Sequence, residues 1–281
     1  MFYFYIVAAI GLIPVLNNFF PLLRESYSWW LVPVLALANF LFFIILHFGF
    51  LALYIQCLSI KKEPKGSRFL RKYVEVSVKL FYTFALVHLH SSGLEKVPDE
   101  GRVLLVCNHR SEVDPAIILS ELADLEVAFV AKKEVYKKLP FVAKALHKMN
   151  GLPIDRENNR EAAKTIINAV KIIKDDKASI GIYPEGYTNR TEDDLLPLRS
   201  GCFKIAERAQ VPIVVCTVYN SAAIFKNMFR RRSDVYFDVA EVISAEEVKE
   251  MHTDAISERV AEIMKKSIEK RRNSINSGKK K

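Results

Sequence analysis

Residues 106–115 read VCNHRSEVDP, and the change there from apolar to polar side chains predicts the carboxyl end of a buried strand in an α/β sheet. The apolar run that leads into it, residues 103–107, is short and bounded by Gly101 and Asn108, as buried strands are. His109 follows the carboxyl end of this strand. Ligand crevices open at that edge of α/β sheets, so we expect His109 to lie beside one.

Asp114 lies five positions after His109 and is followed by Pro115. This pair fits a general base and the carboxylate that orients it. A purely structural interpretation also fits the spacing. In it, Asp114 caps a helix at about residues 116–123, Pro115 fills the first helical position and His109 is an ordinary loop residue. Only motifs elsewhere in the chain can distinguish the catalytic from the structural interpretation.

The rest of the chain alternates strands and helices, which predicts an α/β fold with a mixed, mostly parallel sheet flanked by helices. An apolar stripe predicts a packing helix over residues 161–174, and a similar helix is expected over 245–272. Residues 73–90 fit either a strand or an amphipathic helix that packs on the domain or on a bilayer. Further strands are predicted at residues 128–131, 180–183, 213–219 and 235–239.

The amino-terminal residues predict an apolar helical membrane anchor. The chain has 281 residues, is 51% hydrophobic and carries a formal charge of +9, which allows one globular domain and a membrane segment. Residues 29–60 contain no Lys, Arg, Asp or Glu. As a helix they would extend about 48 Å, at ~1.5 Å per residue, against a hydrocarbon core of ~30 Å. Residues 1–23 are also uncharged, so we expect one or two helices or a hairpin, with Trp29 and Trp30 at the interface.

Basic residues set the expected orientation and surface partners. Those that directly follow the long apolar run predict that the next domain faces the cytoplasm; they are Lys61, Lys62, Lys65 and Arg68. Basic stretches at residues 132–148 and 230–232 would attract an anionic membrane surface at about 1 kcal/mol per residue. No nucleic-acid motif accompanies the charge, so nucleic acid is not an expected partner.

The predicted organisation has four parts. They are a membrane anchor at residues 1–60, a basic linker with an amphipathic segment at 61–90, one globular domain at 91–272 and a basic disordered tail at 273–281. Four cysteines show no disulfide or metal-binding spacing; they are Cys57, Cys107, Cys202 and Cys216. His109 and Asp114 alone are too few ligands for a metal ion, so no metal or cofactor is expected.

Four blocks of sequence, in this order, resemble the glycerolipid acyltransferases typified by 1-acylglycerol-3-phosphate acyltransferase. They are Asn108-His109 with Asp114; Ala131-Lys132-Lys133-Glu134 through Leu139-Pro140-Phe141 to Gly151-Leu152-Pro153-Ile154-Asp155-Arg156; Tyr183-Pro184-Glu185-Gly186 with Leu198-Arg199-Ser200-Gly201-Cys202-Phe203-Lys204; and Val211-Pro212-Ile213. The resemblance covers about residues 93–220, and these would form an acyltransferase domain.

The resemblance implies transfer of a fatty acyl group from a thioester donor, acyl-CoA or acyl-carrier protein, to the hydroxyl of lysophosphatidic acid. The product would be phosphatidic acid for phospholipid synthesis. His109 would be the general base, oriented by Asp114, and the attack would be direct. Residues expected to bind substrate, from the resemblance and from their charge, are Asn108, Lys132, Lys133, Arg156, Glu185, Gly186, Arg190 and Arg199.

One departure from the family pattern concerns the acceptor. The family usually has Thr-Arg-Ser after the Glu-Gly of the third block, whereas here Tyr187-Thr188-Asn189-Arg190 follow. The usual arginine is therefore missing, and Arg190 would replace it only if the loop brings its guanidinium to the same place.

Several alternatives stay open. The acceptor could be glycerol 3-phosphate or another lysophospholipid, and the motif could also persist in a membrane-anchored lipid-binding protein without turnover. Cys107, two residues before His109, raises the possibility of an acyl-thioester intermediate. The chain has no phosphate-cradling glycine loop and no Gly-x-Ser-x-Gly motif, so kinase and serine-hydrolase functions are not supported.

Overall fold

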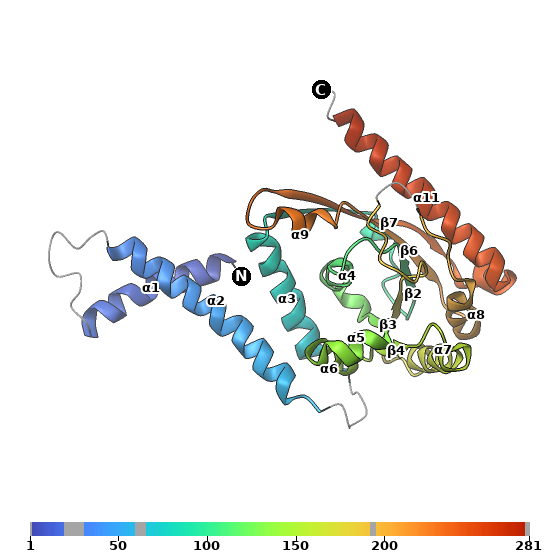
Figure 1. The fold of residues 1–281 in the computed structure, drawn as a ribbon, viewed down its shortest axis with the longest axis horizontal. Helices are drawn as coiled ribbons and strands as arrows, with labels where there is room; N and C mark the ends of the chain where they lie inside the picture. The colour runs from blue at the N-terminus through green and yellow to red at the C-terminus, as the bar shows by residue number, and fades with distance from the viewer. Residues whose placement is uncertain (1, 20–30, 60–65, 192–194, 279–281) are drawn as a thin grey trace. The chain divides into compact units, whose positions relative to one another are not determined.

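The computed structural model describes residues 2–19, 31–59, 66–191 and 195–278 (Figure 1). The chain divides into two compact units, Met1–Leu58 and Ser59–Lys281. The residues expected at a membrane interface or next to a span, Trp29, Trp30, Lys61, Lys62 and Lys65, lie outside the described part.

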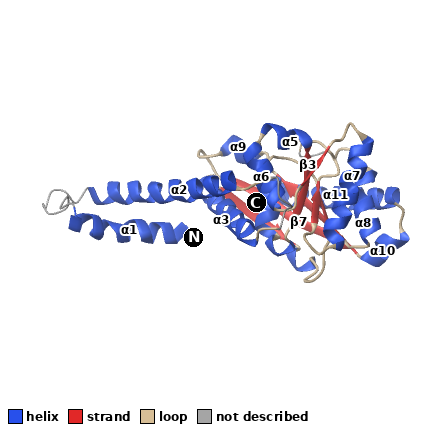
Figure 2. Ribbon diagram, turned by 90° about the horizontal axis from the view of Figure 1, so that it is seen from below, coloured by secondary structure: helices blue, strands red, loops and turns tan. Residues whose placement is uncertain are grey.

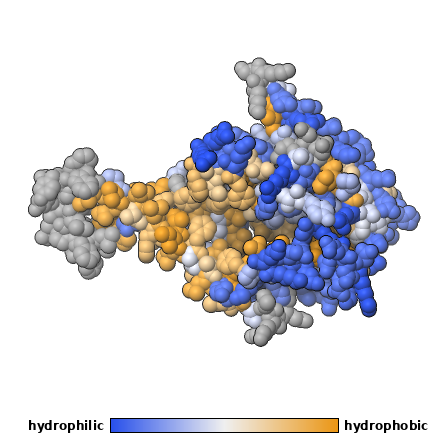
Figure 3. Space-filling model, in the orientation of Figure 1, coloured by the Kyte–Doolittle hydropathy of each residue, from blue (hydrophilic) through white to orange (hydrophobic). Residues whose placement is uncertain are grey.

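The first unit is a pair of antiparallel apolar helices, α1 (Phe2–Phe19) and α2 (Leu31–Cys57). The Tyr5 hydroxyl lies 2.7 Å from Nδ1 of His47, and the Asn39 amide donates to the Ala9 carbonyl at 3.3 Å. Among the described residues, α2 is the helix long and apolar enough to cross a membrane. Its 27 residues extend about 40 Å at ~1.5 Å per residue. The exposed surface of the pair is largely hydrophobic (Figure 3), as the sequence predicts for an anchor.

The second unit is built on a seven-stranded sheet with the order β1-β7-β6-β2-β5-β3-β4. Five neighbouring strands, from β6 to β4, run parallel, whereas β7 is antiparallel to β6 and β1 is parallel to β7. The predicted mixed, mostly parallel sheet is therefore confirmed. The strands are β1 (Val87–Ser92), β2 (Leu104–Cys107), β3 (Ala128–Lys132), β4 (Leu152–Ile154), β5 (Ile180–Ile182), β6 (Ile213–Tyr219) and β7 (Ser233–Ile243).

Helices cover both faces of this sheet (Figure 2), because alternate side chains of each strand point to opposite faces. In β2, Leu104 and Val106 contribute to the core with α7, α8, α10 and α11, whereas Leu105 and Cys107 contribute to the core with α3, α4 and α9. The helices are α3 (Arg68–Phe84), α4 (Asp114–Glu121), α5 (Lys133–Lys138), α6 (Pro140–Lys148), α7 (Asn159–Lys174), α8 (Lys204–Ala209), α9 (Ala223–Asn227), α10 (Ala245–Glu250) and α11 (Thr253–Gly278).

β2 occupies the decisive place in the sheet. It lies between β5 and β6, so the segments that leave these three parallel strands emerge side by side at their carboxyl ends. Chain segments some 75 and 110 residues apart in sequence, near residues 108, 185 and 218, are brought together there, as hydrogen bonds at separations of 76 and 110 residues show.

Two predicted helix starts need correction. The ambiguous residues 73–90 form most of α3 and then β1. The helix is capped by the Ser67 side chain, which accepts a hydrogen bond from the Leu70 amide, and it packs against α4. Asp114 is the first residue of α4 and not its cap; the cap position is Val113. The Asp114 carboxylate accepts hydrogen bonds from amides upstream of the helix instead.

The carboxyl-terminal helix also differs from the prediction. The expected single helix over 245–272 is two helices, because Met251 adopts an extended conformation and Ser244 and Glu247 form a capping box for α10 alone. α11 continues to Gly278, so residues 273–278 of the predicted disordered tail are helical, and 279–281 lie outside the described part. The two Asn-Ser pairs there lower helix propensity by about 0.5 kcal/mol per residue, which the extension of an existing helix tolerates.

The centre of the sheet leaves no room for a side chain at Gly181. This residue lies in β5, in register with Leu105 of β2 and Phe129 of β3. A Cβ atom there would lie 2.6 Å from Val127 Cγ1 and 2.8 Å from Phe129 Cε1. We expect Gly181→Ala to destabilise the domain by about 1–3 kcal/mol through overpacking, measured as a lower Tm in detergent. Gly201→Ala is the control, since nothing lies within 4 Å of its Cβ position; equal Tm values for the two variants would contradict the expectation.

Candidate active site

The candidate site is assembled at the carboxyl ends of the parallel strands. Its parts are the segments that follow β2, β4, β5 and β6, together with the last residue of β3. The contacts below show which of the sequence-predicted residues meet there.

His109 and Asp114 are in contact, as their spacing predicts. Nδ1 of His109 lies 3.0 Å from Oδ2 of Asp114, and the carboxylate is fully buried while the imidazole is 18% exposed. Oδ2 also accepts hydrogen bonds from the amides of Arg110 at 2.6 Å and Ser111 at 2.8 Å. Oδ1 accepts a bond from the Ser221 hydroxyl at 2.6 Å. With a carboxylate as its partner, Nδ1 carries the proton and Nε2 keeps its lone pair on the more exposed side.

Ser221 is the contact that sequence reasoning missed. It follows β6 and is 107 residues from Asp114 in sequence, yet its side chain is fully buried against the carboxylate. No local pattern marks such a residue. The signal that could have found it is its place just after a predicted strand, because the ends of neighbouring parallel strands meet at one edge.

Two residues beside His109 hold its loop in place. The Asn108 side chain accepts from the Val218 amide at 2.7 Å and donates to the Val218 carbonyl at 2.9 Å, so it extends the pairing of β2 with β6. The Arg110 side chain is buried and donates to the carbonyls of Asn189 and Thr191. These contacts give both residues a positioning role. The predicted part of Asn108 in substrate binding stays a prediction.

The segment after β5 binds the backbone of His109 on both sides. Glu185, which is buried, accepts from the His109 amide at 2.8 Å and from the Leu196 amide at 3.0 Å. The Asn189 amide donates to the His109 carbonyl at 2.7 Å. The carboxylate of Glu185 is therefore engaged with the protein's own amides, and its predicted role in binding the acceptor stays a prediction.

The ring of Tyr183 packs against one face of the His109 imidazole. It stacks on His109 with centroids 4.2 Å apart and an angle of 22°, and on Phe129 at 5.9 Å. Burial raises the pKa of the Tyr183 hydroxyl well above its usual range, so the ring stays neutral. Stacking on one face and the hydrogen bond to Asp114 on one edge leave the His109 ring a single orientation.

Two guanidinium groups meet three residues beyond Tyr183. Gly186 adopts a left-handed conformation, with φ of +79°, and a Cβ atom there would lie 2.8 Å from Nε of Arg199 and 3.6 Å from Nη1 of Arg156. Burial, and then the charge of Arg199, lower the pKa of Arg156. Nη1 of Arg156 is buried and has no hydrogen-bond partner among the described residues. Two adjacent cations with an unused donor form a site that an anion would stabilise.

The remaining predicted cations fall into two groups. Lys132 lies 4.4 Å above the ring of Tyr187, and Arg199 contacts the same ring at 5.7 Å, so Lys132 belongs to the cationic group around Gly186. Lys133 pairs with Asp155 at 3.4 Å. Arg190 is exposed and pairs with Glu112 at 3.0 Å, which contributes, after a backbone hydrogen bond, to the lowered pKa of that carboxyl. Arg190 is not among the residues that line the cavity described next.

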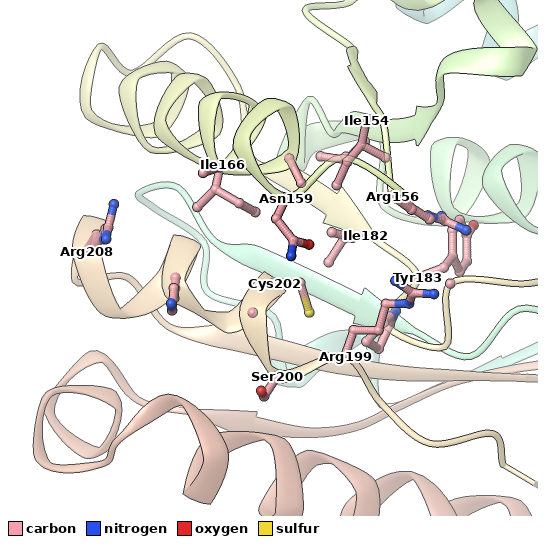
Figure 4. Close-up of a pocket in the computed structure, with 17 residues that line it drawn as sticks. Ile154, Arg156, Asn159, Ile166, Ile182, Tyr183, Arg199, Ser200, Cys202 and Arg208 are labelled. Atoms are coloured by element: carbon pink, nitrogen blue, oxygen red, sulfur yellow. The ribbon is translucent and has the colours of Figure 1, made fainter.

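A cavity of about 480 Å³ begins at Arg156 and Arg199. Its middle is apolar and lies between α7, β5 and the turn that carries Cys202, while Arg208 marks its far end (Figure 4). The lining apolar side chains are Val130, Ile154, Ala162, Ala163, Ile166 and Ile182. An apolar interior with a doubly cationic end suits an amphiphile with an anionic head group.

Cys107 is poorly suited to form a covalent intermediate. It is fully buried in β2, and burial raises the pKa of its thiol well above the usual range. Because the thiolate is the nucleophilic form, a thiol that stays protonated is inert.

Among the described residues, three side chains outside this site lie close enough together to hold a metal ion. His88, His90 and Asp234 place one ligand atom each within 4.8 Å of one another, on β1 and β7. Arg232 lies among them and donates to Oδ1 of Asp234 and to Nδ1 of His88, both at 2.6 Å. A guanidinium therefore already compensates the carboxylate there.

Comparison with known proteins agrees with this geometry. The family model described as Acyltransferase matches residues 88–219. The chain is 27% identical, over 68% of its length and 76% of the relative's, to a 1-acyl-sn-glycerol-3-phosphate acyltransferase of Borreliella burgdorferi. It is 32% identical to the enzyme of the same name from Helicobacter pylori, but over 48% of this chain and 56% of that protein.

The fold is shared with a solved structure. The crystal structure of the 1-acyl-sn-glycerophosphate acyltransferase from Thermotoga maritima matches with a TM-score of 0.61, at 20% identity, over 82% of this chain and 93% of that one. The family model covers β2, β5 and β6 with His109 and Asp114, and it ends two residues before Ser221. Residues 88–219 match the Acyltransferase family model, so this part of the chain resembles the acyltransferase domains of these relatives.

Proposed function

We propose that this chain transfers a fatty acyl group from a thioester, acyl-CoA or acyl-carrier protein, to the free hydroxyl of lysophosphatidic acid. The observation that carries the proposal is the joining of two sites by one short turn. Tyr183 stacks on His109, which is bound to Asp114, and three residues later Gly186 contacts Arg156 and Arg199. A base and an anion site are thus held at a fixed separation, as a substrate with both a hydroxyl and a phosphate requires.

The chemistry follows from the protonation of His109. Nε2 takes the proton of the acceptor hydroxyl as its oxygen attacks the thioester carbon. The imidazolium that forms is stabilised by the buried Asp114 carboxylate. The tetrahedral intermediate then collapses, the C–S bond breaks, and the departing sulfur takes the proton from Nε2. The products are the new oxygen ester and a free thiol, and His109 is neutral again.

The anion site accounts for acceptor recognition. A phosphate presents several oxygens, and the two guanidinium groups of Arg156 and Arg199 can engage them together while relieving their mutual repulsion. Lys132 adds a third positive charge across the Tyr187 ring. These contacts replace the arginine that the family usually has after the Glu-Gly pair, and Arg190 is not needed for the role.

We further propose the organisation in which residues 1–60 anchor the chain, 61–90 connect, and 91–272 carry the reaction on the cytoplasmic face of the membrane. The first support is α2, which has an apolar surface and whose 27 residues extend about 40 Å, more than the ~30 Å hydrocarbon core. The second is the run of basic residues that follows it in sequence. Lysophospholipids and their products reside in the bilayer, so an anchored enzyme meets its acceptor there.

Replacing the proposed base tests the reaction. We expect His109→Ala to lower turnover by ~10²- to 10⁴-fold without unfolding the protein, because general-base catalysis contributes that much. Ser221→Ala should cause a smaller loss, since Asp114 keeps its other hydrogen bonds. The measurement is transfer of labelled acyl groups from acyl-CoA or acyl-carrier protein to lysophosphatidic acid in detergent. His252→Ala, an exposed histidine outside the site, is the matched control.

Two results would count against this role. Turnover by His109→Ala equal to that of wild type would show that His109 is not the base. Lipid binding by wild type without turnover would favour a lipid-binding protein. Product formed only with glycerol 3-phosphate or with another lysolipid would keep the mechanism and change the acceptor.

Replacing a cavity arginine tests the anion site. We expect Arg199→Ala to raise KM for lysophosphatidic acid by about 10- to 100-fold with less effect on kcat, because a hydrogen bond to a charged group contributes about 1.5–3 kcal/mol. Activity with monoacylglycerol, which lacks the phosphate, should change little. Arg160→Ala, an exposed arginine that does not line the cavity, is the matched control. A rise in KM for acyl-CoA alone would assign the site to the donor.

Replacing Cys107 separates direct attack from an acyl-enzyme. Because the thiol is buried and held protonated, we expect Cys107→Ala to retain turnover and to lose only some thermal stability. Labelled acyl groups should not remain on the denatured wild-type protein. A variant that folds but is inactive would reinstate the covalent route.

A further inference from the structure

A short segment around α9 exposes two aromatic side chains to solvent. Phe225 of α9 is 51% exposed and Phe229, just after the helix, is 71% exposed, the largest value among the large apolar residues described in Ser59–Lys281. Leu86, whose carbonyl accepts from the Ser233 amide at the end of the same segment, is 46% exposed. Residues 225–232, named here the α9 loop, thus form an apolar projection with Leu86 beside it.

The backbone holds these side chains outward at a cost. Phe229 has φ of +61° and Leu86 has φ of +54°, in the left-handed region that side chains disfavour. Strain of this kind persists where the surrounding structure enforces it. Two of the three exposed apolar residues here, Phe229 and Leu86, are thus also strained, whereas Phe225 lies in α9. That coincidence indicates that the exposure serves a contact.

The charge of the α9 loop identifies the partner. Lys226, Arg230, Arg231 and Arg232 lie within it; Arg232 pairs with Asp234 at 2.6 Å, and residues 220–233 themselves contain no Asp or Glu. Where Figure 1 places α9, Figure 3 shows strongly hydrophilic and hydrophobic surface side by side. Aromatic side chains flanked by arginines fit the interface of an anionic bilayer, where each basic residue near the surface contributes about 1 kcal/mol and the rings leave water.

The α9 loop is fixed to the candidate active site at its first turn. Ser221, which binds Asp114 at 2.6 Å, also accepts the amide of Ile224 through its carbonyl at 3.1 Å, and the Ile224 side chain is fully buried. At the other end, the Asn227 amide donates to the buried Ser233 hydroxyl at 3.1 Å. A contact made by Phe225 and Phe229 is therefore transmitted rigidly to the segment that holds Asp114.

We infer that the α9 loop inserts Phe225 and Phe229 into the surface of an anionic bilayer, with Arg230 and Arg231 at the phosphate level, as a second membrane contact in addition to the helical anchor. The inference rests on the proposed membrane anchoring of α2, and it deepens the proposed function. It connects the segment that holds Asp114 to the surface of the bilayer in which a lysophospholipid resides. An acidic protein is the alternative partner, but protruding single rings match a fluid surface better than a shaped one.

Site-specific fluorescence tests this contact in the full-length protein. In a Cys57→Ser background the other three cysteines are buried, so Phe229→Cys can be labelled alone with an environment-sensitive dye. The protein is reconstituted in vesicles of phosphatidylcholine with or without phosphatidylglycerol. Glu250→Cys is the control, because α10 lies at the opposite end of the unit from α9 (Figure 2) and Glu250 is exposed.

We expect the dye at position 229 to shift to the blue and to be quenched by nitroxide-labelled lipid in the anionic vesicles, while the dye at 250 stays accessible to aqueous iodide. Arg230→Glu with Arg231→Glu should remove most of the quenching at 229. Equal behaviour of the two positions in protein that pellets with the vesicles would overturn the inference. So would a blue shift that needs added acyl-carrier protein and occurs without lipid quenching.

Acyl transfer measured with unlabelled wild type in the same vesicles keeps the two proposals apart. Quenching at 229 without any transfer by wild type would support the contact and reject the proposed reaction. Transfer by wild type without quenching at 229 would do the opposite.

Discussion

A buried carboxylate with four hydrogen-bond donors is the interaction on which the site depends. Asp114 has no exposed surface, and a bare carboxylate there would be strongly disfavoured. The imidazole of His109, two amides of its own loop and the hydroxyl of Ser221 together satisfy it. Because these donors come from the ends of two neighbouring strands, the carboxylate can be satisfied only when β2 and β6 are paired in register. Correct pairing of these two strands therefore also fixes the orientation of His109.

Much of this arrangement could be predicted from local sequence. The strand over residues 103–107 and the contact of His109 with Asp114 were predictable because both depend on a few consecutive residues. β1 and β4 were not, since VHLHSS has only two apolar residues and LPI is too short to show a period. The alternative interpretation of Asp114 as a helix cap stayed open because the Asp-Pro signal is the same whether the carboxylate turns toward its own helix or toward the amides before it. Ser221 was beyond any local pattern.

The cationic end of the cavity illustrates how a resemblance and a structure complement each other. Arg156 and Arg199 lie 43 positions apart in sequence, and the family blocks and charge together named them along with Lys133 and Arg190. The structure separates these four, since Lys133 and Arg190 have carboxylate partners whereas Arg156 and Arg199 both lie against Gly186. Charge by itself could not distinguish them, because pairing depends on the neighbours that folding supplies.

The segment after β5 positions the backbone of the proposed base and also departs from the usual family pattern. Its Glu185 and Asn189 bind the amide and the carbonyl of His109, and Tyr187 to Arg190 are the residues that differ from the usual family pattern. A sequence change that adapts this loop to a new acceptor therefore also shifts the backbone of the base. Loops exchanged among relatives should be tolerated as whole units together with their partners after β2, and poorly as single residues. Acceptor preference in such a domain would then diverge in jumps, with few intermediates along the way.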